Sequence, residues 1–226
     1  MNIPKQVDGS RCHVLDWVET PQFVDTVKGW TRDQSLQIPD DPVFMPKSWA
    51  QPDESKLFDA ASPFLSGDDK TRLGKWWLAH PGIANIPNWD LIVAASTSAN
   101  VPALVLVEAK AHATEFDCKS KPVSKRKTPV AQKRTDENHE QIGHAIAEAA
   151  RALANFHSRI KFDRNHCYQL SNRIAMGWKL ASMGIANTLV FLGFTGDREI
   201  DREGKYFADD KHWQEAFANY AKLPRG

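Results

Sequence analysis

The sequence predicts an α/β fold in which a central mixed β-sheet is flanked by helices. Two short apolar runs, LIVAA from Leu91 and ALVLV from Ala103, are joined by a polar turn around 96–100. A connection this short joins antiparallel strands, because a parallel crossover needs a dozen residues or more. A third apolar run, LVFLGF at 189–194, follows two long helical patterns and is expected to add a further strand.

Apolar residues three and four positions apart predict the helices. Leu73, Trp76 and Trp77 give one segment an apolar face, and the segment from Asp136 repeats its apolar residues at 4-3-4-3 spacing. Gly184 suits the residue just after a helix. The four main helices are predicted at 68–79, 136–160, 166–183 and 209–223.

Prolines recur throughout the first 50 residues, which predicts an irregular arm. A short helix is expected near Val14–Thr20 or Pro21–Gly29, and another from Pro52 to Ala61. The chain is expected to be a single domain. Its parts are the N-terminal arm at 1–65, a core at 66–195, a basic loop at 113–135 and a C-terminal helix in 196–226.

The composition is that of an ordinary globular protein, with 42% hydrophobic and 25% charged residues. No apolar run approaches the roughly 20 residues of a membrane span, and no secretory leader is visible. Cys12, Cys118 and Cys167 form no CxxC pair, so neither a zinc knuckle nor a disulfide framework is indicated. We therefore expect a cytoplasmic protein with reduced thiols and no membrane partner.

The stretch from Lys119 to Arg134 holds seven basic residues and no acid. Within Thr114–Thr135, the polar composition and two prolines predict a mobile loop. Such a loop could contact nucleic-acid phosphates, or it could serve only to keep the protein soluble. The candidate nucleic-acid contacts are Lys119, Lys121, Lys125, Arg126, Lys127, Lys133 and Arg134.

Three charged residues bracket the predicted hairpin. Asp90 precedes the first strand, and Glu108 and Lys110 end the second. Strand side chains alternate, so Glu108 and Lys110 share a face, with Asp90 roughly opposite Glu108. Two neighbouring carboxylates repel unless a cation lies between them, and Mg²⁺ is commonly held by one or two carboxylates with water and phosphate oxygens. The alternative is a structural Glu–Lys pair at a strand end.

Asp90, seventeen intervening residues and then Glu108-Ala109-Lys110 resemble the motif of the PD-(D/E)xK nuclease superfamily. The resemblance covers roughly residues 66–195 and implies a restriction-endonuclease-like fold. It further implies a Mg²⁺- or Mn²⁺-dependent nuclease acting on nucleic acid, with DNA as the expected substrate. Asp90 and Glu108 would bind the metal, the Ala109 carbonyl would be a third ligand, and Lys110 would be the catalytic lysine.

Three other residues are candidate accessories to this site. His112 lies two positions after Lys110 on the same strand face, although a solvated histidine is as reasonable there. Glu54 is the nearest upstream glutamate, a position that some members of the superfamily use for an extra ligand. Some members also carry a glutamine after the motif, for which Gln141 and Gln169 are available and Gln169 is preferred.

Two other functions remain open at this point. The chain could bind nucleic acid or another partner on the same fold without catalysis, or it could use Glu108 and Lys110 for acid–base chemistry on a small molecule. Cutting both strands of a duplex would favour a homodimer.

Overall fold

A computed structural model describes most of the chain and divides it into two compact units. The first unit is formed by the described parts of 1–55, 88–116 and 185–219, and the second by those of 56–87, 117–184 and 220–226. The described residues are 9–32, 35–81, 86–116, 118–156, 161–198 and 205–221.

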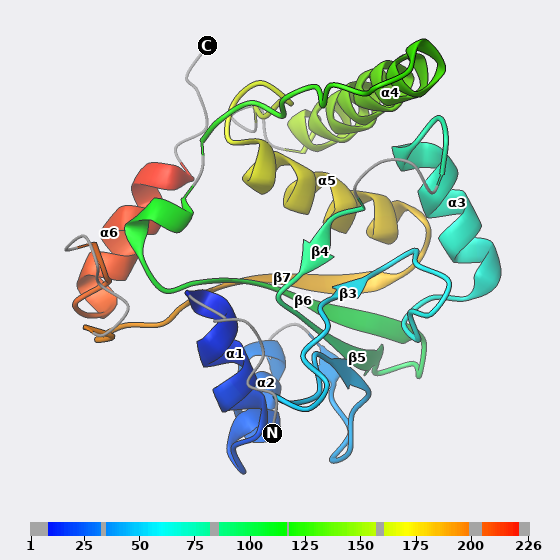
Figure 1. The fold of residues 1–226 in the computed structure, drawn as a ribbon. Coiled ribbons are helices and arrows are strands. Elements are labelled where there is room, and N and C mark those ends of the chain that lie inside the picture. Colours follow the sequence, from blue (N-terminus) through cyan, green and yellow to red (C-terminus); the bar gives the residue numbers. More distant parts are fainter. Residues whose placement is uncertain are drawn as a thin grey trace. The chain divides into compact units, whose positions relative to one another are not determined.

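The first unit is built on a mixed sheet (Figure 1). Strand β5 (Leu91–Thr97) pairs antiparallel with β6 (Pro102–Lys110), which pairs in parallel with β7 (Ala186–Gly193). Two short strands of the N-terminal arm, β1 (Leu36–Gln37) and β2 (Phe44–Met45), pair antiparallel with β5. The predicted hairpin and the mixed α/β sheet are therefore confirmed.

Helices α1 (Ser10–Val18) and α2 (Phe23–Thr31) contribute to a hydrophobic core with this sheet. Val14 and Val18 of α1 and Phe23 and Val27 of α2 are four residues apart, so each pair lies on one helix face. They pack in one cluster with Leu91, Val93, Val105, Val107 and Ala109, which alternate along β5 and β6. Both of the N-terminal helices considered from the sequence are present.

An aromatic cluster joins α6 (Asp210–Tyr220) to the loops at the end of the sheet. The Trp213 ring lies 5.5 Å from Phe116, 5.1 Å from Phe207 and 5.6 Å from Phe217, measured between centroids. Phe207 is fully buried. The predicted end of this helix at 222–223 lies outside the described residues.

The second unit contains α3 (Gly67–Trp77), α4 (Pro129–Ala154) and α5 (Tyr168–Ser182). Trp76 of α3 donates its indole N–H to Glu148 of α4 at 3.0 Å and accepts a bond from Gln141 through its carbonyl. Of the short elements, β4 (Asn88–Trp89) and the 3₁₀ turn Ala113–Glu115 belong to the first unit, and β3 (Ser55–Lys56) spans the boundary between the two units along the chain. Among the described residues, no helix is long and apolar enough to cross a membrane.

Two expectations about local structure are wrong. The segment 52–61 is not a helix, since it turns at Asp59, whose carboxylate accepts the N–H of Ala61. The long helix begins at Pro129, not Asp136, because the Thr128 hydroxyl caps it and Pro129 fits the first helical position. Lys133 and Arg134 therefore lie on α4.

The expectation of reduced thiols is also wrong for two of the three cysteines. Cys118 and Cys167 form a disulfide, whereas Cys12 is free. The backbone N–H of Cys167 donates to the Cys118 carbonyl at 3.1 Å, so the two segments run side by side at the bond. The 49-residue separation hides this pairing from a search for short cysteine motifs.

Candidate functional site

The three charged residues of the hairpin gather at one end of β5 and β6. The ladder pairs Leu91 with Val107, so the preceding residue, Asp90, is opposite Glu108 in the same register. Residues directly opposite in an antiparallel pair project from the same face, about 4.5–5.5 Å apart at Cβ. The predicted cross-strand relation between Asp90 and Glu108 is thus confirmed.

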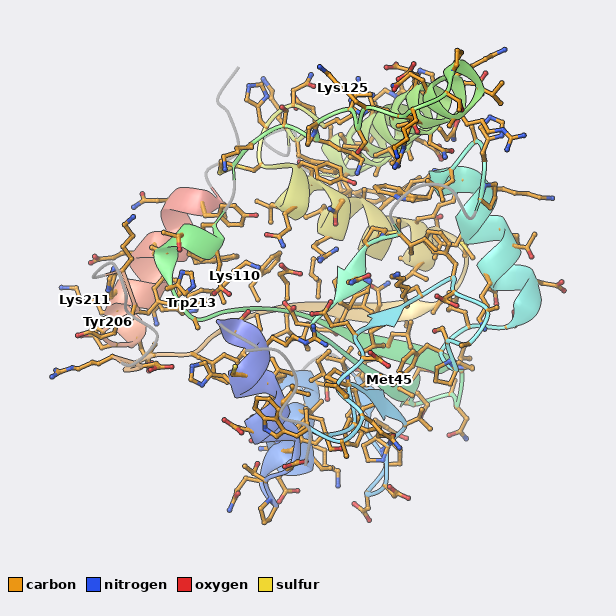
Figure 2. All side chains as sticks on the ribbon, viewed as in Figure 1. Met45, Lys110, Lys125, Tyr206, Lys211 and Trp213 are labelled. Carbon is orange, nitrogen blue, oxygen red and sulfur yellow. A yellow bond between two sulfur atoms is a disulfide. The ribbon has the colours of Figure 1, made fainter. Side chains whose placement is uncertain are left out.

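The alternation of side chains along β6 determines which face of the sheet Glu108 and Lys110 occupy. Val105, Val107 and Ala109 belong to the core with α1 and α2, so Glu108 and Lys110 project from the opposite face. Both are almost completely shielded from solvent, with Glu108 1% and Lys110 4% exposed (Lys110 is labelled in Figure 2). Charges buried this deeply require partners.

Two short contacts connect the site. The Lys110 ammonium lies 2.5 Å from Oε1 of Glu108. The backbone N–H of Ala109 donates to Oδ2 of Asp90 at 2.7 Å. The first contact matches the structural ion pair considered from the sequence, and the second fixes the Asp90 carboxylate against β6.

The electrostatics of the site make Asp90 hard to ionise. Burial raises the pKa of Asp90, the Glu108 charge raises it further, and the pKa reaches about 7. Lys110 and the Ala109 N–H act in the opposite direction, and the charge of Glu54 also raises the pKa. A carboxyl group that titrates near neutrality beside a second acid can accept a cation or transfer a proton.

Glu54 lies close enough to influence the pKa of Asp90. Its Oε2 accepts a bond of 2.9 Å from Asn88, which lies two residues before Asp90. Its Oε1 lies 4.0 Å from Nε of Arg11 on α1. Glu54 therefore belongs to the edge of this site, and Arg11 and Asn88 are the residues that the sequence did not single out.

The donor set can be compared with what a metal needs. Among the described residues, no group of three or more His, Cys, Asp or Glu side chains could hold a metal ion. Mg²⁺ often takes only one or two carboxylates and completes its shell with water and phosphate oxygens. Asp90 and Glu108 fit that smaller requirement, since a cation between them would offset the Glu108 repulsion that, after burial, raises the pKa of Asp90.

His112 has a local structural role. Its Nδ1 is hydrogen-bonded to the Thr114 hydroxyl, and its backbone N–H donates to Glu115 at 3.2 Å. Glu115 also accepts the N–H groups of Ala111 and, at 3.0 Å, Ser10. These bonds hold the chain after β6 in its 3₁₀ turn.

The remaining candidates lie in the second unit. Gln169 is in the first turn of α5, whereas the Gln141 side-chain amide donates a hydrogen bond to the Trp76 carbonyl. The basic residues lie on the segment after Cys118 and on the first turns of α4. Most are exposed and Lys121 is half-buried.

Comparisons of the chain with protein-family models, with curated proteins and with solved structures found no match. The resemblance to the PD-(D/E)xK superfamily therefore rests on the residues of the site alone.

Proposed function

We propose that this chain is a metal-dependent nuclease of the PD-(D/E)xK type that hydrolyses phosphodiester bonds in DNA. The observation that supports this most is the convergence of Asp90, Glu108 and Lys110 at one strand end. Two opposed carboxylates followed by an ammonium two residues later are the donor set that such chemistry uses.

Asp90 and Glu108 would hold Mg²⁺ or Mn²⁺, with the Ala109 carbonyl as a further ligand. A bound metal of this kind polarises the phosphoryl oxygen and lowers the pKa of a coordinated water. Asp90 must be ionised to bind it, which requires a pH near or above the pKa of about 7 or competition by the metal for the proton. Lys110, once Glu108 turns to the cation, would orient the attacking water and stabilise charge on the phosphate.

The basic residues from Lys119 to Arg134 would supply non-specific affinity for the phosphate backbone. Their exposed side chains suit contacts that depend on charge and not on sequence. No recognition module is evident, so we propose no sequence specificity. A cytoplasmic location and a homodimer remain predictions.

The test is cleavage of plasmid and linear DNA by the purified protein with Mg²⁺ or Mn²⁺. Asp90→Asn and Lys110→Met should each lower the rate by at least 100-fold, on the order expected for loss of a metal ligand or of a transition-state donor. Asp41→Asn and Lys75→Met change the same charges at exposed positions outside the site and the basic segment, and should cut like the wild type. Equal cleavage by all four variants would refute the assignment.

A second candidate is a nucleic-acid-binding protein without catalysis. The direct contact between Lys110 and Glu108 favours it, because the pair neutralises itself without a metal. DNA binding that persists with a chelator present, together with no cleavage and no metal binding at pH 8, would select this function.

A further inference from the structure

A small cavity in the second unit is lined by polar and basic side chains together with the apolar residues Pro122, Val123 and Ile142. It has a volume of about 40 Å³, whereas a single water needs about 10–15 Å³ by the same measure. The lining side chains include Lys121, Ser124 and Arg126 from the basic segment and Thr135 and His139 from α4. No acid lines it.

Among the described residues, no acid offsets the charge of Lys121. Burial lowers the pKa of Lys121, and no carboxylate in the described part of the chain raises it again. The ammonium lies 4.6 Å from the centre of the Tyr168 ring, a contact that weakly favours a cation. A half-buried ammonium in this setting is stabilised when an anion binds beside it.

His139 adds an unused polar atom. Its Nδ1 is shielded from solvent and has no hydrogen-bond partner among the described residues. Burial and the charges of Arg164 and Lys121 lower the pKa of His139, while Glu140 and Asp136 act in the opposite direction. The local field at the imidazole is therefore positive.

Arg164 is held against α4 by a close approach. Its Nη1 donates to the His139 carbonyl at 2.6 Å and lies 3.3 Å from Glu140. A Cβ at Gly143 would lie 2.8 Å from the same Nη1, so the glycine makes room for the guanidinium.

The walls of the cavity are fixed in place. Arg126 donates its Nε to the Thr135 hydroxyl at 3.0 Å, which leaves its terminal guanidinium nitrogens for other acceptors. Gln132 accepts the Arg126 backbone N–H at 2.8 Å. The backbone of Lys121 donates to the Arg164 carbonyl, and the Cys118–Cys167 disulfide anchors the start of the segment. The part of the basic segment that contains Lys121 and Arg126, which was expected to be mobile, is therefore held by these bonds as one side of the cavity.

We propose that this cavity binds a phosphate group, either free phosphate or the terminal phosphate of a nucleic-acid strand. A guanidinium suits two phosphate oxygens at once, and the ammonium and hydroxyl groups suit the others. The small volume accommodates one tetrahedral group. This inference does not depend on cleavage, since all of its residues lie in the second unit and it requires no metal.

The test is calorimetric titration of the full chain with inorganic phosphate in a chloride buffer that contains a chelator. Lys121→Gln and Arg126→Gln should each weaken binding at least tenfold. Lys125→Gln and Arg134→Gln remove the same charges from exposed positions outside the cavity and should change it less than twofold (Lys125 is labelled in Figure 2). Equal losses in all four variants, or no phosphate binding by the wild type, would overturn the proposal.

A second readout locates the ligand independently of the variants. The ring signals of His139 should shift on addition of phosphate, with no matching shift for His212 of the first unit. Competition then separates the two sources. Displacement of phosphate by a 5′-phosphorylated oligonucleotide, and not by its unphosphorylated form, identifies a strand terminus, whereas displacement by neither identifies free phosphate. Shifts at both histidines or at neither would contradict binding in this cavity.

Discussion

The backbone N–H of Ala109 donates a hydrogen bond of 2.7 Å to Oδ2 of Asp90. The bond ties the carboxyl group of one strand to the next strand, one residue from Glu108. It favours the ionised form, but burial and the Glu108 charge outweigh it, and the pKa of Asp90 rises to about 7. Asp90 therefore changes charge near neutral pH.

This pKa predicts how the stability of the metal-free protein depends on pH. Between the unfolded value of 3.8 and about 7, the folded state keeps a proton that the unfolded state has released. The free energy of unfolding should therefore fall as pH rises through this window, by on the order of 2–4 kcal/mol. Urea titrations at pH 5 to 8 with a chelator measure it. Asp90→Asn should abolish this decrease in the free energy of unfolding, whereas Asp41→Asn should leave it unchanged. If the free energy of unfolding depends on pH equally in the wild type and in Asp90→Asn, the raised pKa of Asp90 is contradicted.

The buried pair of Glu108 and Lys110 predicts strong coupling between two substitutions. Lys110→Met removes the buried cation that contacts Glu108 and should cost roughly 3–5 kcal/mol of stability. Adding Glu108→Gln should recover most of that loss, because neither charge then remains. Denaturation of both single variants and the double variant measures the coupling. The exposed pair of Lys28 and Asp40 is the control, with a much smaller effect expected for Lys28→Met. Additive losses at Glu108 and Lys110 would argue against a direct pair.

Gly193, which is paired with Lys110 in the sheet, should not tolerate a side chain. A Cβ there would lie 2.3 Å from Cδ2 of Trp213, so the indole must leave its aromatic cluster (Trp213 is labelled in Figure 2). We expect Gly193→Ala to cost about 1–3 kcal/mol of stability, as overpacking does. Gly29→Ala in α2 meets no atom within 4 Å and should be neutral or stabilising. Thermal denaturation compares the two, and equal melting temperatures would show that Trp213 does not pack on Gly193.

The disulfide predicts a count of free thiols. The unfolded, unreduced chain should take up one equivalent of an alkylating reagent, at Cys12, and the reduced chain three. Mass spectrometry measures both numbers. Replacing Cys118 and Cys167 together by serine should cost roughly 3–4 kcal/mol, as expected for a loop of this length. Three equivalents without reductant would show that the bond is absent.

The part of the fold that could be predicted from the sequence is the part governed by local pattern. The apolar runs at Leu91 and Ala103 fixed the hairpin, and its short turn fixed the direction of the strands. Because side chains alternate along a strand, the common face of Glu108 and Lys110 followed as well. The pairing of β1 and β2 with β5 could not be predicted, because two-residue strands in a proline-rich arm carry no periodic signal.

The parts of the site that were missed depend on contacts between distant segments. Arg11 and Asn88 reach Glu54 from other elements, and the Ala109 N–H reaches Asp90 across the ladder. The cavity around Lys121 combines segments that only the fold and the disulfide bring together. The start of α4, in contrast, is a local feature that could have been predicted, because Thr128-Pro129 is a recognisable capping sequence.

The proposed nuclease requires that Asp90 and Glu108 hold a divalent metal beside Lys110. Anomalous diffraction from crystals soaked in Mn²⁺ at pH 8, where Asp90 is ionised, would locate that metal. We expect one strong peak within about 2.0–2.6 Å of a carboxylate oxygen of each residue, with the Lys110 ammonium displaced from Glu108. No peak at saturating Mn²⁺, with Lys110 still 2.5 Å from Glu108, would contradict it.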